Sequence, residues 1–191
     1  MTTKLLLTPN EYSRPMKPMN VRGIVLHWVE NPGQSARSVM HYFEQRKEGK
    51  HGYGSAHYIV DDEEIIQCIP WDEMAYHVGA KQYTEMALKR FGPYPNSFLI
   101  GIELCHPDWT GKPTAKTLFN AEGLCCDLCM LYHIDPVEYI VTHYQITNKV
   151  TPRGPCPKWF IEHPSELDMF RLKVKECIVK RYEHETIKNA W

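Results

Sequence analysis

Two histidines and a cysteine stand at positions in this chain where side chains can bind a metal ion. His27 lies at the end of the apolar run Gly23–Trp28, and His143 ends the run that begins at Tyr139. Cys156 lies between two prolines, a position that a packed core residue rarely takes. Imidazole and thiolate both suit zinc, and a catalytic zinc site combines three protein ligands with a water. The three side chains are therefore candidate zinc ligands from separate elements, although a single histidine is more often a hydrogen-bonded or surface residue.

A carboxylate interrupts another apolar run, Ile100–Leu104. Carboxylates are rarely buried unless they are paired, so Glu103 has two interpretations. It either faces solvent or pairs with a cation in a structural role, or it is a general base whose pKa is raised by its apolar neighbours. The residues around Glu103 favour neither interpretation over the other.

The elements that must position these residues alternate along the chain. Apolar runs predict strands at 22–28, 56–60, 65–69, 98–104 and 139–142, the second and third forming a hairpin. Capping residues and apolar faces predict helices at 35–49, 84–91, 114–133 and from Ser165 onward. Residues 8–20 are expected to form an extended arm, and the proline-rich segment 144–164 shows no clear element. This order predicts a single α/β domain with a mixed central β-sheet flanked by α-helices.

The composition excludes several classes of protein. The net charge of −1, with no basic block, argues against a partner bound through nucleic-acid phosphates. No apolar run approaches the roughly 20 residues of a membrane helix, so no membrane insertion is expected. Three consecutive leucines near the N-terminus are too few for a signal-peptide core, so we expect synthesis in the cytoplasm.

Seven cysteines form no evident disulfide framework, and we interpret them as reduced thiols. Cys126 and Cys129 form a C-x-x-C pair, but it falls inside an amphipathic helix pattern and has no second pair. We therefore expect buried core thiols, with a redox protein as a distant alternative.

A set of short motifs, taken together, resembles the zinc-dependent N-acetylmuramoyl-L-alanine amidases of phage endolysins and bacterial autolysins. Their fold is shared with peptidoglycan-recognition proteins. The motifs are Tyr12–Pro15, Val21–Trp28, Ser55–Val60, Ile66–Pro70, Ala75–Gly79, Ile100–Leu104, Thr142–His143 and Cys156–Pro157. The resemblance covers roughly residues 10–178. It implies a catalytic domain at 1–178 and leaves 179–191 as a polar C-terminal tail or linker.

The resemblance also implies roles for individual residues. It makes His27, His143 and Cys156 the ligands of one Zn²⁺ per chain, and it makes Glu103 the group that activates the attacking water.

Three further residues are implied at the substrate site. His77 matches a motif that lines the substrate groove, and His57 matches a strand histidine near the site, for which a hydrogen-bonded core role is an equal alternative. Family members often carry Lys or Arg two residues before the cysteine ligand. Here that position is Gly154, with Arg153 one step further away as a candidate stabiliser of the oxyanion.

The implied reaction is hydrolysis of the amide between N-acetylmuramic acid and L-alanine in peptidoglycan, by an enzyme that reaches the cell wall after phage or prophage lysis. Peptidoglycan is the expected partner, and a monomer is favoured. The alternatives are a non-catalytic peptidoglycan-binding module and a zinc hydrolase of another amide. A separate wall-binding domain outside this sequence is left open.

Overall fold

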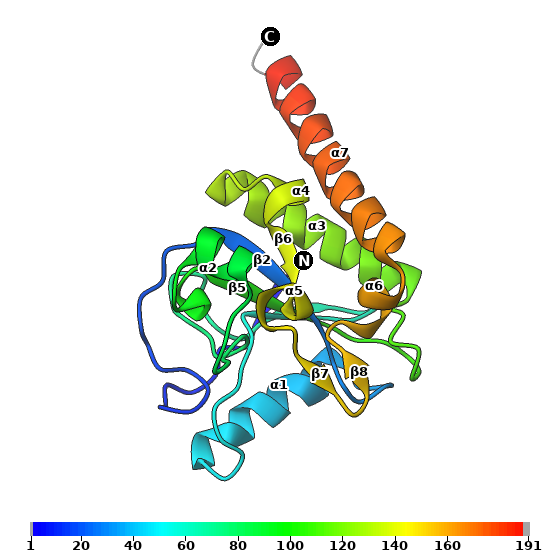
Figure 1. Cartoon of the computed structure of the whole chain (residues 1–191). Coiled ribbons are helices and arrows are strands. Elements are labelled where there is room, and N and C mark those ends of the chain that lie inside the picture. The colour runs from blue at the N-terminus through cyan, green and yellow to red at the C-terminus, as the bar shows by residue number, and fades with distance from the viewer. Residues whose placement is uncertain (1, 189–191) are drawn as a thin grey trace.

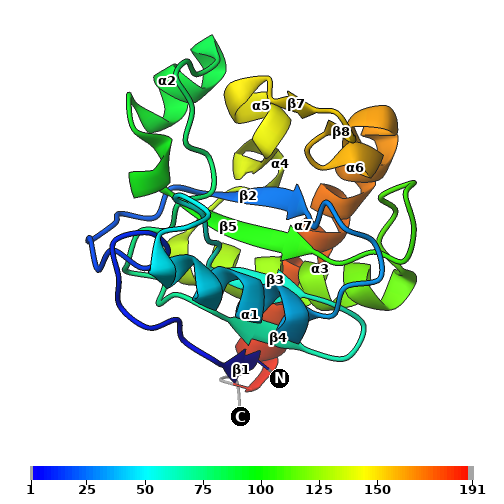
Figure 2. The ribbon, with the colours of Figure 1, turned by 90° about the horizontal axis from the view of Figure 1, so that it is seen from below.

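A mixed sheet of six strands lies at the centre of the protein (Figures 1 and 2). The computed structural model describes residues 2–188. In spatial order the strands are β1 (Thr2–Lys4), β4 (Ile65–Gln67), β3 (Tyr58–Val60), β5 (Leu99–Leu104), β2 (Gly23–Trp28) and β6 (Ile140–Thr142). Strands β3 and β4 pair antiparallel as the predicted hairpin, and the other neighbours in this sheet pair parallel. The predicted mixed sheet is therefore confirmed.

Helices surround this sheet, and several begin where the sequence predicts. The side chains of Ser35, Thr84 and Thr114 each accept a hydrogen bond from a backbone N–H of the first helical turn. The helices are α1 (Ala36–Gln45), α2 (Glu85–Phe91), α3 (Ala115–Tyr132), α4 (Pro136–Tyr139), α5 (His143–Thr147), α6 (Lys158–Glu162) and α7 (Pro164–Lys188). Short 3-10 turns follow α1 at Arg46–Glu48 and precede β5 at Pro95–Ser97.

Side-chain alternation along the strands divides the core between the two sides of the sheet. Ile24 of β2 and Ile100 of β5 pack with α3 and α7 on one side. Val25 and Leu99 pack with α2 and α5 on the other side, where α1 covers the neighbouring strands β3 and β4 in a separate cluster. Figure 1 shows α3 and α7 together across the sheet from α1. On this side of the sheet, α1 covers one part and α2 with α5 covers another. The groove lies between these two parts.

The proline-rich segment 144–164 holds more structure than its sequence indicates. Thr142 and Gln145 form a capping box that begins α5, and β7 (Val150–Thr151) pairs with β8 (Gly154–Pro155). Helix α6 follows at once. These elements are two to five residues long, so hydrophobic periodicity cannot reveal them.

Helix α7 continues past residue 178, where a polar tail or linker was expected to begin, as far as Lys188. No Gly or Pro occurs between Ser165 and Lys188, so no residue in this stretch breaks the helix. Its C-terminal half projects away from the rest of the domain (Figure 1). Most of the expected tail at 179–191 is therefore helical, residues 189–191 lie outside the described part of the chain, and a linker role stays a prediction.

The C-x-x-C pair lies in the core, as expected. Cys125, Cys126 and Cys129 are buried free thiols of α3 in the cluster that joins α3 and α7 to the sheet. Between residues 2 and 188, no helix combines the length and the apolar character needed to cross a membrane.

Candidate metal centre

The sheet register brings His27 and Glu103 together. The two residues are direct partners in the parallel pairing of β2 with β5. Successive side chains of a strand point to opposite faces, so His27 faces away from the side that Ile24 occupies, and Glu103 faces away from the side that Ile100 occupies. Both therefore lie on the side of the sheet where the groove is. They stand near the carboxyl ends of parallel strands, which is the edge where open α/β sheets bind ligands.

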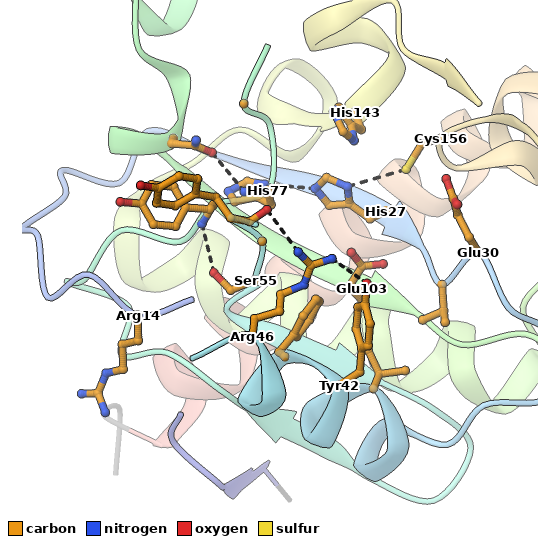
Figure 3. A pocket seen from close by; sticks show the side chains of 18 of the residues that line it. Arg14, His27, Glu30, Tyr42, Arg46, Ser55, His77, Glu103, His143 and Cys156 are labelled. Carbon is orange, nitrogen blue, oxygen red and sulfur yellow. Dashed lines mark hydrogen bonds between the residues drawn. The ribbon is translucent and has the colours of Figure 1, made fainter. Parts of the chain in front are cut away.

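The chain after β6 supplies the other two candidate ligands. His143 is the first residue of α5, directly after β6, and Cys156 directly follows β8. The hairpin β7–β8 thus returns the chain to the groove after α5 has left it. Figure 3 shows His27, His143 and Cys156 gathered at one place although they come from three elements.

The three side chains form a compact and buried cluster. Their candidate ligand atoms all lie within 4.8 Å of one another, and the Cys156 Sγ lies 3.6 Å from the His27 Nδ1. Two ligand atoms of a tetrahedral zinc with bonds of about 2.0–2.3 Å lie roughly 3.5 Å apart. The buried Nε2 of His143 has no hydrogen-bond partner among the described residues. Donor types and spacing therefore fit a metal ion such as zinc.

Burial keeps the candidate ligands uncharged. It lowers the pKa of His143 to about 3 and holds the pKa of His27 well below its usual value. It also raises the pKa of the Cys156 thiol. Neutral imidazole is the form that binds a metal, but the thiol must lose its proton. Metal binding at this cluster would therefore release a proton from Cys156.

Glu103 is a carboxylate without a partner. No described residue donates a hydrogen bond to it or forms an ion pair with it, so a salt bridge does not explain its place in the strand. Burial raises its pKa to about 8, the charge of Glu30 adds to this effect, and the charge of Lys149 opposes it. A carboxylate with such a pKa can accept and return a proton near neutral pH.

The groove that holds these residues is large. Its volume is about 1290 Å³, and its walls include His27, Glu103, His143 and Cys156. The N-terminal arm and α1, with its Tyr42, form part of the wall. Four further tyrosines form another part: Tyr53, Tyr76, Tyr83 and Tyr94. Aromatic faces beside buried polar groups are typical of a site that holds an extended ligand.

The two other candidate histidines occupy different positions. His77 lines the groove, but its ring is buried and contacts His27 through a hydrogen bond. His57 is fully buried and is absent from the groove wall. Its Nδ1 accepts from the Gly101 N–H, and its Nε2 donates to the Glu73 carbonyl. These contacts favour the core role of His57.

Arg153 and Lys149 both line the groove that holds the cluster, and the sequence indicated only Arg153. Arg153 donates from Nη1 to the Asn31 Oδ1 and the Glu30 carbonyl, and its guanidinium lies over the Trp109 ring. Lys149 lines the groove, and no hydrogen bond or ion pair within residues 2–188 holds its side chain. Its charge lowers the pKa of His27, Glu103, His143 and Cys156 alike. A lone lysine in a segment with no predicted element carries no sequence signal, so only the structure identifies Lys149.

The fold and the cluster define a class: an α/β domain with a buried cluster of two histidines and one cysteine, a candidate metal site, in a groove. Residues 17–158 match the Amidase_2 family model, described as N-acetylmuramoyl-L-alanine amidase. The chain belongs to this family.

Individual relatives agree with this assignment. A probable N-acetylmuramoyl-L-alanine amidase of Bacillus licheniformis is 34% identical over 173 residues, which cover 90% of this chain and 46% of the relative. The amidase CwlL of Bacillus licheniformis is 36% identical over 171 residues, 88% of this chain and 45% of CwlL. The solved structure of PlyL matches with a TM-score of 0.70 and 26% identity, over 91% of this chain and 96% of PlyL. The chain spans about half the length of the curated relatives it matches.

Proposed function

We propose that this protein is a zinc-dependent amidase that hydrolyses the bond between N-acetylmuramic acid and L-alanine in peptidoglycan. One observation carries the proposal: Glu103, a carboxylate with no partner among residues 2–188, lies in the same groove as a buried cluster of three zinc-type ligands. A module that only binds its ligand has no need of such a carboxylate, because leaving it unpaired in a partly buried place costs free energy.

The roles of the chain's own groups follow from their positions. His27, His143 and Cys156 would hold the zinc, which when bound acidifies water and polarises a carbonyl. Glu103 takes the proton of the attacking water and passes it to the nitrogen of the leaving L-alanine. Its raised pKa suits both halves of this transfer.

The groove supports a glycopeptide substrate. Its volume of about 1290 Å³ exceeds the range of about 300–1,000 Å³ typical of small-molecule pockets. The tyrosines along its wall can pack on sugar rings and on the backbone of a stem peptide. The names of the two Bacillus licheniformis relatives describe the same bond.

We propose the bacterial cell wall as the place of action. Release by lysis and a monomeric state stay predictions.

We expect the protein to release new amino groups on L-alanine from purified peptidoglycan. End-group analysis of the soluble products measures this release, and an equal digest with a zinc chelator is the control. Binding to peptidoglycan without new ends would support a binding module instead. New ends on residues other than L-alanine would support a hydrolase of another amide.

We assign the stabilisation of the oxyanion to Lys149 rather than to Arg153. The Arg153 guanidinium is held by Asn31 and Glu30. Lys149 also lines the groove, and its positive charge lowers the pKa of both Glu103 and His143. Removing one oxyanion donor typically costs about 10²–10³ in turnover. We therefore expect a loss of that size in Lys149→Met and less than about tenfold in Arg153→Met, measured as kcat on a purified muropeptide.

The two methionine variants control for each other, because both remove a cation and keep an unbranched stem. Zinc content should be unchanged in both. A larger loss of kcat in Arg153→Met than in Lys149→Met would reverse the assignment.

A further inference from the structure

A chain of hydrogen bonds leads from the backbone of β5 to the candidate metal cluster. The His77 Nε2 lies 2.9 Å from the carbonyl oxygen of Leu99. The His77 Nδ1 lies 3.0 Å from the Nε2 of His27. The other nitrogen of His27, Nδ1, lies 3.6 Å from the Cys156 Sγ. Figure 3 shows His77, His27 and Cys156 connected in this order.

The backbone carbonyl fixes the direction of every hydrogen bond in this chain. A carbonyl oxygen can only accept, so the His77 Nε2 must carry a proton and donate it to Leu99. In a neutral imidazole the other nitrogen, Nδ1, is then an acceptor. The His27 Nε2 must therefore carry the proton that His77 Nδ1 accepts. The lone pair of His27 is left on Nδ1, the nitrogen that faces Cys156.

The ring of His77 has little freedom to leave this position. Its backbone N–H and that of Val78 both donate to the Oδ1 of Asn96, at 3.2 and 3.0 Å. A Cβ placed on Gly101 would lie 2.7 Å from the His77 ring, so the absence of a side chain at Gly101 makes room for it. The rings of His57 and His77 also pack against each other in an edge-to-face arrangement, with centroids 5.8 Å apart. The His77 Nδ1, which accepts the hydrogen bond from His27, is thus held in place by these contacts.

We propose that His77 is a positioning residue that sets the tautomer and the ring orientation of His27, so that His27 offers Nδ1 to the metal. The inference rests on the proposed zinc site and deepens it. Histidines that bind metals commonly donate their second N–H to a carboxylate, carbonyl or water. Here a second histidine takes that place, and it is itself oriented by the backbone of β5.

The first test needs no substitution and no zinc. A long-range ¹H–¹⁵N NMR spectrum of the metal-free wild-type protein reports which nitrogen of each histidine carries the proton. We expect His27 and His77 both to be protonated at Nε2. A proton on Nδ1 of His27 would overturn the proposal.

The second test measures zinc affinity by competition with a chromophoric chelator. Loss of an outer-shell partner typically weakens metal binding about 10–100-fold, and we expect this loss in His77→Leu. In His77→Asn the amide oxygen can stand where Nδ1 stood and accept the His27 proton, so we expect recovery to within a few-fold of wild type. Equal zinc affinity in His77→Leu and wild type would also overturn the proposal.

His57→Leu is the matched control. It removes a neighbouring buried histidine that likewise has both nitrogens bonded, but its partners are Gly101 and Glu73 rather than His27. We expect it to lose stability and to keep zinc affinity to within a few-fold of wild type, because His57 contacts His77 through ring packing alone, which leucine can replace in part. A wild-type protein that binds no zinc would refute the proposed function. Zinc binding that is normal without His77 would refute the positioning role alone.

Discussion

Glu103→Gln is expected to lower turnover by about 10²–10⁴-fold, the usual cost of losing a general base. The amide keeps the shape of the side chain and cannot take a proton from water. Glu103 has no partner among the described side chains, so its replacement breaks no ion pair. Zinc content, folding and muropeptide binding should therefore survive. The measurement is kcat on a purified muropeptide, together with zinc content by mass spectrometry.

The pH dependence gives a second check on the same residue. Only the carboxylate form of Glu103 can accept a proton, so kcat/KM should rise with pH until Glu103 is ionised. Burial raises its pKa to about 8, and a bound dication would lower that value by favouring the charged form. We therefore expect the acidic limb below pH 8, and we expect it to be lost in Glu103→Gln.

Glu30→Gln is the matched control for this prediction. The charge of Glu30 raises the pKa of Glu103, so its removal should move the acidic limb to lower pH and leave the maximal rate nearly unchanged. A Glu103→Gln protein that unfolds or loses zinc would instead indicate a structural or ligand role. Near-normal cleavage in this variant would end the proposal for Glu103.

The positions of His27 and Glu103 could be predicted in large part from the sequence. Each lies in an apolar run that predicts a buried strand, and a polar side chain in such a run must find a special environment. The sequence does not contain the register that makes them direct partners. That register results from how the faces of β2 and β5 pack against α3 and α7, which depends on the whole core.

Lys149 and the role of His77 could not be predicted in this way. Lys149 reaches the groove through α5 and β7, which are too short to leave a periodic signal. The role of His77 depends on two hydrogen bonds, one to Leu99 and one to His27 across 50 positions of the chain. Local sequence indicates which residues are available for chemistry. It does not specify which nitrogen of a ring meets which acceptor.

Alanine at His27, His143 or Cys156 is expected to abolish zinc-dependent activity, because a catalytic zinc site has three protein ligands. The loss of zinc affinity should exceed the 10–100-fold expected for His77→Leu, since these variants remove a zinc ligand itself, whereas His77→Leu removes only the residue that positions a ligand.

A ligand present at about 100 times its Kd stabilises a fold by about 2.7 kcal/mol. Zinc should therefore raise the Tm of wild type and leave the Tm of the three variants unchanged. Cys68→Ala is the matched control, because it removes a buried thiol that is not part of the groove wall. It should lose some stability and keep both zinc and the zinc-dependent rise in Tm. Any of the three alanine variants that retains full zinc removes its residue from the site.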